Sequence, residues 1–259
     1  MLDLWAAPAQ PDHVVGWRQQ QINLAPQYLL NWGNETDAPD VGSCRGGSAY
    51  QSFAYIHAKG IVDETCCPYR AEDLWRKPAG SGDKASTCIA EMTCRNCDFE
   101  NGCYAVEESA TGGAGKYRRY WVDEYGPVGS SGAAGVHAIQ AEIFTRGPIA
   151  CSINASNPEF EGLHYEGYND LVAQSAASSS APIFKDAHPE QNTDTTHVIS
   201  LVGWGDDPNG GQYWIGRNSW GSYWGLSDWF LIEKGTNALL VEDHCYFATP
   251  SLTPVHGAS

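Results

Sequence analysis

Cysteine spacing constrains this chain more than any other feature of its sequence. Nine cysteines occur in 259 residues, and six of them lie between Cys66 and Cys103, where apolar runs are few. A stretch of this kind buries too little apolar surface to hold itself together, so we expect disulfides to stabilise it. Such a density predicts the oxidising environment of the secretory or endolysosomal route. Because the count is odd, at least one cysteine has no partner within the chain.

Charge and hydropathy argue against two classes of protein, those that bind nucleic acid and those that span a membrane. Fifteen Lys and Arg stand against 31 Asp and Glu, which gives a net charge of −16. Binding to phosphates requires clustered basic residues, so no nucleic acid is expected as a partner. The longest apolar run, residues 198–204, is much shorter than a membrane-spanning helix, so no membrane span is expected.

The amino end does not fit a protein of the secretory route. Residues 1–10 (MLDLWAAPAQ) have neither the basic region nor the apolar region of a signal peptide. Residues 1–21 are expected to be irregular, because Pro8 and Pro11 interrupt them. Together with the disulfide-rich composition, this predicts that the chain lacks the beginning of the protein, its signal peptide included.

Helical and strand patterns occupy different halves of the chain. Helices are expected at residues 26–32, at residues 49–59 between an N-cap at Ser48 and a stop at Gly60, and at residues 136–146 before Gly147. Short aromatic or β-branched strands are expected at residues 149–153, 197–204, 213–217 and 228–233. The low-complexity segment 173–181 is expected to be a flexible surface insertion. This order predicts an α+β fold with two lobes.

Two motifs in the strand-rich half carry the chemistry. His197 opens one predicted strand, and residues 217–221 (RNSWG) follow another. Each motif alone is compatible with a structural role, the first as a core histidine and the second as a glycine-bounded hairpin. An imidazolium, however, is what turns a thiol of pKa near 8.5 into a thiolate at neutral pH. In this order, the two motifs resemble the His and Asn half of a papain-family cysteine peptidase.

This resemblance implies a papain-like two-lobe α+β fold, incomplete at its N-terminus, in a protein that hydrolyses peptide or protein substrates. It assigns His197 as the general acid and base, Asn218 as the residue that orients the imidazole, and Trp220 as the shield of their hydrogen bond. Gly46 and Gly47 in residues 42–47 (GSCRGG) resemble the substrate-binding glycines, where the missing Cβ lets a peptide approach closely. A plain turn is the alternative for Gly47. The resemblance implies no cofactor, and it adds protein inhibitors as possible partners.

Flanking motifs resemble one branch of the family, that of cathepsin X (cathepsin Z), a lysosomal carboxypeptidase group. The motifs are residues 60–66, 147–151 and 242–245 together with the cysteines from Cys88 to Cys103, and the resemblance covers about residues 22–247. It divides the chain into a non-matching segment (1–21), the remnant of a helical, disulfide-rich lobe (22–110) and a strand-rich lobe (111–259). The branch implies a lysosomal, endolysosomal or extracellular location.

The same branch implies disulfides that can be assigned to this sequence. They are Cys66 with Cys94, Cys97 with Cys103, and Cys151 with Cys245. Trp32 stands where the branch has the partner of Cys88, so Cys67 with Cys88 is a replacement pair, and Cys44 is left over.

The catalytic nucleophile is the one part of the resemblance that has no counterpart in the sequence. Family members begin a long central helix with a Cys-Gly-Ser-Cys-Trp-Ala motif, and neither the motif nor an upstream oxyanion-hole Gln is found here. Cys44 follows Gly-Ser but precedes Arg-Gly-Gly. Aligning residues 4–6 (LWA) with Cys-Trp-Ala puts Leu4 at the thiol position, but Pro8 and Pro11 exclude the helix that should follow. No nucleophile is therefore assigned, and the chain alone is expected to be inactive.

Two explanations stay open. In the first, the reading frame continues upstream of Met1 and supplies the thiol to an active peptidase. In the second, the chain is a pseudo-peptidase that binds peptides or a protein partner without cutting them. The first is favoured, because loss of the central helix would remove much of the contact between the lobes of a marginally stable protein.

Three further signals are weaker. Asn34 and Asn154 each begin an N-glycosylation triplet. Cys94 and Cys97 form a Cys-x-x-Cys pair that could be half of a zinc site, but no second pair follows at the usual distance. The histidines show no metal-ligand spacing, so no metal is expected.

Overall fold

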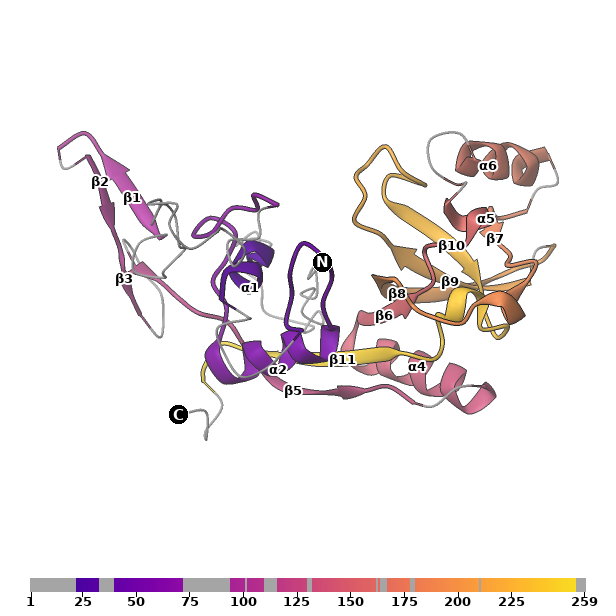
Figure 1. The fold of residues 1–259 in the computed structure, drawn as a ribbon, viewed down its shortest axis with the longest axis horizontal. Helices are drawn as coiled ribbons and strands as arrows, with labels where there is room; N and C mark the ends of the chain where they lie inside the picture. Colours follow the sequence, from indigo (N-terminus) through magenta and orange to yellow (C-terminus); the bar gives the residue numbers. More distant parts are fainter. Residues whose placement is uncertain are drawn as a thin grey trace, which may run out of the picture. The chain divides into compact units, whose positions relative to one another are not determined.

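A computed structural model describes residues 22–32, 40–71, 94–100, 102–109, 116–129, 132–161, 163, 167–177, 180–209 and 211–254 (Figure 1). These residues form two compact units, which are described separately. The sheet unit is Gly126–Phe247, and the disulfide unit is Leu2–Tyr125 together with Ala248–Ser259.

A seven-stranded sheet has the strand order β5-β11-β6-β8-β9-β10-β7. Its strands are β5 (Trp121–Pro127), β6 (Ile149–Ile153), β7 (Ile183–Phe184), β8 (His197–Asp207), β9 (Gly211–Arg217), β10 (Trp229–Glu233) and β11 (Cys245–Ser251). Strand β7 pairs parallel to β10, whereas the pairs β11–β6, β6–β8, β8–β9 and β9–β10 are antiparallel. The predicted strand at residues 149–153 is confirmed, and those at 197–204, 213–217 and 228–233 are confirmed with slightly different ends.

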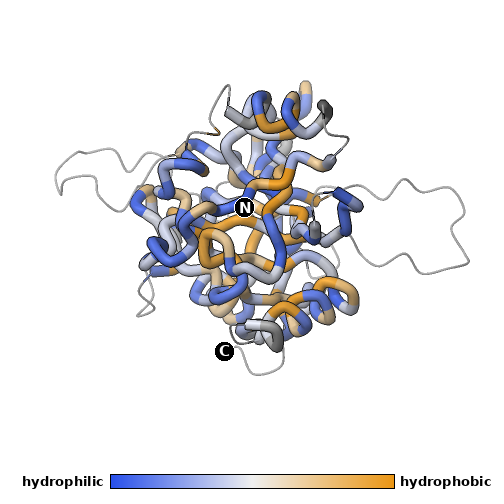
Figure 2. Tube along the Cα trace, turned by 90° about the vertical axis from the view of Figure 1, so that its right-hand side faces the viewer, coloured by the Kyte–Doolittle hydropathy of each residue, from blue (hydrophilic) through white to orange (hydrophobic). Residues whose placement is uncertain are grey.

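Alternating burial along these strands builds the core of the sheet unit. In β6, the side chains of Ile149, Cys151 and Ile153 are buried and those between them are partly exposed, as the two-residue period of a strand requires. The core also includes Ile199, Leu201, Trp214, Phe230 and Ile232. Figure 2 shows the resulting succession of hydrophobic and hydrophilic stretches along the chain.

Helix α4 (Ala133–Arg146) packs against β8 and contributes Ile139 and Ile143 to this core. It ends at Gly147, whose φ of 99° lies in the left-handed region that favours glycine. The outward side of the helix carries Phe144, which is 85 % exposed. The predicted helix at residues 136–146 is therefore confirmed, with one more turn at its start.

The other helices described in the sheet unit are short. They are α5 (Pro158–Glu161), α6 (Tyr168–Ala177) and the 3-10 turns η3 (Pro189–Gln191) and η4 (Ala238–Leu240). Helix α6 shows that the prediction of a flexible insertion from residue 173 to 181 was wrong for residues 173–177. Alanine and glutamine are good helix formers, and low sequence complexity did not prevent these residues from continuing the helix.

The described residues of the disulfide unit include two helices, α1 (Pro26–Trp32) and α2 (Ala49–Lys59), both as predicted. Ser48 caps α2 by accepting the N–H of Gln51, and Gly60 ends it with a φ of 71°. Two small ladders follow: β1 (Arg95–Asp98) pairs with β2 (Gly102–Ala105), and β3 (Glu107–Glu108) pairs with β4 (Lys116–Tyr117). The core of this unit includes Leu24, Tyr28, Ile56, Ile61 and Val62.

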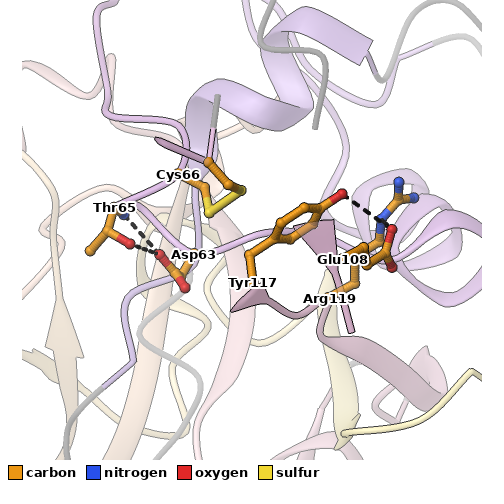
Figure 3. The surroundings of a disulfide bond; sticks show 7 residues. Asp63, Thr65, Cys66, Glu108, Tyr117 and Arg119 are labelled. Carbon is orange, nitrogen blue, oxygen red and sulfur yellow. Dashed lines mark hydrogen bonds and ion pairs between the residues drawn. A yellow bond between two sulfur atoms is a disulfide. The ribbon is translucent and has the colours of Figure 1, made fainter. Parts of the chain in front are cut away.

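The part of the chain that the structure describes has three disulfides: Cys66–Cys94, Cys97–Cys103 and Cys151–Cys245. These are the three pairs that the family resemblance implies. The first lies beside a partly buried polar cluster, in which the hydroxyl of Tyr117 donates to Glu108 at 3.2 Å and Arg119 pairs with Glu108 at 3.3 Å (Figure 3). Burial, and then the charge of Glu108, raises the pKa of Tyr117. Cys88, the proposed partner of Cys67, lies outside the described residues.

Candidate active site

Strand register brings the two sequence motifs together. His197 is the first residue of β8, and Asn218 directly follows the last residue of β9. The two strands are antiparallel neighbours in which Ser200 is opposite Arg217, so the start of β8 and the end of β9 lie at the same end of the pair. Two residues 21 positions apart in sequence therefore meet.

The contact between them fixes the protonation pattern of the imidazole. His197 Nε2 lies 2.9 Å from Asn218 Oδ1. The same Oδ1 accepts the backbone N–H of Ser219 at 2.8 Å, which identifies this atom as the oxygen of the amide. An oxygen in this position only accepts, so Nε2 carries the proton and donates it. Nδ1 is left as the nitrogen that exchanges a proton with a reacting group.

One aromatic ring covers this histidine, and further rings back that ring. The indole of Trp220 stacks on the imidazole, with ring centroids 5.1 Å apart and an interplanar angle of 26°. Trp220 in turn meets Trp224 edge-on at 5.3 Å and Phe160 at 6.0 Å. Asn218 is only 2 % exposed. The hydrogen bond between Asn218 and His197 is thus held among aromatic groups, where polar interactions are stronger than in water.

Burial sets the acid–base character of His197. Desolvation disfavours the imidazolium and lowers the pKa of His197 below its ordinary value of 6.5. The hydrogen bond to Asn218 and the charge of Asp228 act in the opposite direction, because both favour the charged form. Burial thus lowers the pKa of His197, while the hydrogen bond to Asn218 and the charge of Asp228 limit this decrease.

The predicted substrate-binding glycines lie in the disulfide unit. Ser43 and Gly46 exchange two backbone hydrogen bonds, of 2.8 and 3.1 Å, and so close a tight turn. Gly46 has a φ of 123°, and a Cβ on Gly47 would lie 2.8 Å from the Cα of Gly42. Within the loop itself, then, both positions require glycine. Binding of a substrate by these glycines stays a prediction.

Cys44 lies in the same turn. It is exposed and forms no disulfide with any residue that the structure describes. Its sulfur is 3.6 Å from the carbonyl oxygen of Ala71.

The described part of the chain offers no site for a metal ion, because no three His, Cys, Asp or Glu side chains converge in it. Cys94 and Cys97, the pair that suggested half a zinc site, are each in a disulfide with another cysteine. Among the described helices, none is long and apolar enough to cross a bilayer.

Asn154, one of the two possible N-glycosylation sites, belongs to a network of hydrogen-bonded polar side chains. Its Nδ2 donates to Asn192 Oδ1 at 2.8 Å, while its Oδ1 accepts the N–H of Ser156 at 3.1 Å. Asn192 continues the network by donating to Asp186 at 2.6 Å. The nitrogen that would carry a sugar is thus already engaged. Asn34 lies outside the described residues.

We expect Asn154 to carry no glycan, because one of its two Nδ2 hydrogens is donated to Asn192 and attachment of a sugar in place of that hydrogen would lose a hydrogen bond worth about 1 kcal/mol. The measurement is the intact mass of protein from a glycosylating host, before and after enzymatic removal of N-glycans. The Asn154→Gln variant should lose no glycan mass relative to the unchanged chain. Loss of one glycan in this variant would contradict the expectation, and Asn34→Gln provides the matched comparison.

Asp228 is the site residue that the sequence did not reveal. Its carboxylate accepts the backbone N–H of Trp220 at 3.0 Å, and its own carbonyl accepts that of Asn218 at 2.8 Å. The only sequence signal was an aspartate in the turn between two tryptophan-rich segments, and no spacing rule relates such an aspartate to a histidine 31 residues earlier.

Comparison with known proteins identifies the class to which this arrangement belongs. Residues 8–255 match the family described as papain family cysteine protease. Almost the whole chain is matched, and the chain therefore belongs to the papain family of cysteine proteases.

A relative supports the predicted branch. Cathepsin Z of Onchocerca volvulus is 33 % identical over 233 residues, which cover 87 % of this chain and 61 % of that protein. The chain thus spans about three-fifths of the length of this relative.

Solved structures agree with the fold. Procathepsin L 3 from the larval midgut of Tenebrio molitor aligns with a TM-score of 0.55 at 21 % identity, covering 89 % of this chain and 56 % of its own. The bromelain protease of Ananas comosus aligns with a TM-score of 0.56 at 18 % identity, covering 89 % of this chain and 79 % of its own. Both confirm the predicted α+β papain-like two-lobe fold.

Proposed function

We propose that this protein is a cysteine peptidase of the cathepsin X/Z type and that the 259 residues contain the acid–base half of its active site. The observation that carries the proposal is the 2.9 Å hydrogen bond from His197 to Asn218 under the stacked ring of Trp220. This arrangement holds an imidazole in one tautomer and one orientation, which proton transfer at a fixed point in space requires.

The role of each residue follows from this geometry. With Asn218 bound to Nε2, the imidazolium delivers the proton on Nδ1 to the leaving amine when a thiolate attacks the peptide carbonyl. In the second half of the reaction, Nδ1 takes a proton from the water that hydrolyses the thioester. Asn218 keeps the imidazole in place throughout, and Trp220 excludes water from one face of it.

We further propose that the chain alone is inert and that residues encoded upstream of Met1 supply the thiol. Six of the nine cysteines are paired in the three disulfides. Cys67 is completely buried, and Cys44 lies in the glycine turn. None of the nine has the Cys-Trp-Ala context of a nucleophile.

The location and substrates are proposed on chemical grounds. Three disulfides suit an endolysosomal or extracellular compartment, where such bonds persist. The substrates are peptides or proteins, and the branch favours removal of residues from a free carboxyl end. Protein inhibitors of such peptidases are proposed as further partners.

The test compares three proteins: the 259-residue chain, the same chain extended upstream in its reading frame, and the extended chain with His197→Ala. Each is assayed on a peptide with a free carboxyl end and on its amidated counterpart. We expect no hydrolysis by the short chain, hydrolysis by the extended chain with preference for the free carboxylate, and loss of at least about 10³-fold with His197→Ala.

Two results would overturn this proposal. Hydrolysis by the short chain that disappears with Cys44→Ala would identify Cys44 as the nucleophile. An extended chain that binds the peptides without cutting them would identify a pseudo-peptidase.

A further inference from the structure

The turn before β10 contains two strained residues beside the histidine site. Ser227 and Asp228 have φ angles of 55° and 75°, in the left-handed region that residues with a side chain adopt at a cost in free energy. Glycine would adopt this conformation without the cost. A strained non-glycine residue next to a functional site indicates that its side chain has a purpose there.

Asp228 is held in the turn through its own backbone. Its N–H donates to the carbonyl of Trp224 at 2.7 Å, and Leu226 and Trp229 exchange backbone hydrogen bonds of 2.8 and 3.3 Å on either side of it. Gly225 has a φ of 57°, and a Cβ there would lie 2.5 Å from the carbonyl oxygen of Trp229. The position of the Asp228 carboxylate is therefore determined by a closed turn.

From this position, Asp228 makes two contacts with the site. Its carbonyl accepts the N–H of Asn218 at 2.8 Å, and its Oδ1 accepts the N–H of Trp220 at 3.0 Å. Asn218 orients the imidazole, and Trp220 stacks on it. One residue thus holds both groups that enclose His197.

The charge of Asp228 has a second effect. A carboxylate near an imidazole favours its protonated form, which opposes the effect of burial on His197. The neighbouring charged side chain, Arg217, has its guanidinium 5.3 Å from the ring centre of Trp229. Ile153, which faces His197 on strand β6, carries no titratable group. Asp228 is the carboxylate whose charge raises the pKa of His197.

We propose that Asp228 is a positioning residue of the His197 site, which fixes Asn218 and Trp220 against the imidazole. The significance for catalysis rests on the proposed function, because an imidazolium is the partner of a catalytic thiolate. The effect on His197 itself does not depend on that function and can be measured in the 259-residue chain.

Asp228→Asn and Asp228→Gly separate the two effects. The asparagine keeps an oxygen that accepts the Trp220 N–H but removes the charge, whereas glycine removes both and relieves the strained φ. Asp206→Asn is the matched control, since it removes one negative charge at the opposite end of the strand that His197 begins.

The measurement is an NMR titration of the His197 ring protons, whose chemical shifts report both protonation and stacking on Trp220. We expect Asp228→Asn to lower the pKa of His197, because loss of the carboxylate disfavours the cation, and to keep the ring-current shift from Trp220. Asp228→Gly should lower the pKa and also diminish the ring-current shift. Asp206→Asn should change neither.

The inference is overturned if the pKa of His197 is the same in Asp228→Asn as in Asp206→Asn. It is also overturned if Asp228→Gly keeps the full ring-current shift. In the extended chain, Asp228→Asn should move the alkaline limb of kcat/KM to lower pH, because the imidazolium is then lost earlier as pH rises. An extended chain without activity contradicts the proposed function, while the NMR result still decides the role of Asp228.

Discussion

Replacing Cys151 and Cys245 together with alanine is expected to lower the free energy of unfolding by about 4 to 5 kcal/mol. The bond joins residues 94 positions apart, and closing a loop of that length removes much of the conformational entropy of the unfolded chain. The two cysteines are also opposite each other on β6 and β11 and are almost completely buried, so alanine leaves unfilled space as well. Urea denaturation of the full chain, followed by circular dichroism, measures the loss.

The chain contains a matched control for this prediction. Cys97 and Cys103 close a loop of only six positions in an exposed hairpin, so the corresponding double alanine variant should lose about 2 kcal/mol. The Cys97–Cys103 bond is therefore expected to contribute less to stability than the Cys151–Cys245 bond. Equal losses in the two variants would show that loop length does not govern the contribution of these bonds.

Phe160→Ala is expected to destabilise the sheet unit by about 3 to 5 kcal/mol. Phe160 is completely buried and lies at the centre of an aromatic cluster, with ring centroids 5.5 to 6.0 Å from those of its neighbours. Its neighbours are Phe184, Trp220, Trp224 and Phe230. Alanine would leave a cavity that the surrounding rigid rings fill only in part.

The consequence should reach the histidine as well. Trp220 contacts both Phe160 and His197, so we expect the cavity to loosen the stack on the imidazole. We expect the pKa of His197 to move up toward its ordinary value in Phe160→Ala, because water reaches a less buried ring. Phe144→Ala, at an exposed position of α4, should change stability by less than about 0.5 kcal/mol. An equal loss in both variants would contradict the prediction.

Local signals in the sequence were sufficient for most of the secondary structure. Ser48 and Gly60 mark the two ends of α2, and Gly147 marks the end of α4, because capping and left-handed φ angles are properties of single residues. Residues 173–177 were predicted as flexible because low complexity was given more weight than helix propensity.

The site was only partly accessible from the sequence. The motif around Asn218 and the histidine at the start of a strand identified two groups, and the register of β8 and β9 places them 2.9 Å apart. Asp228 could not be found in this way, since its contact with Trp220 depends on a turn of left-handed residues. No periodicity or spacing encodes a contact of this kind.

The Cys151–Cys245 bond also determines what a backbone cut would do to this protein. His197, Asn218 and Trp220 all lie between the two cysteines in sequence. A single cleavage at any peptide bond inside this loop leaves two pieces that remain joined through sulfur, so neither can diffuse away. In a compartment rich in other peptidases, a molecule cleaved once inside this loop would keep all three residues covalently linked. Separation would require cleavage and reduction together.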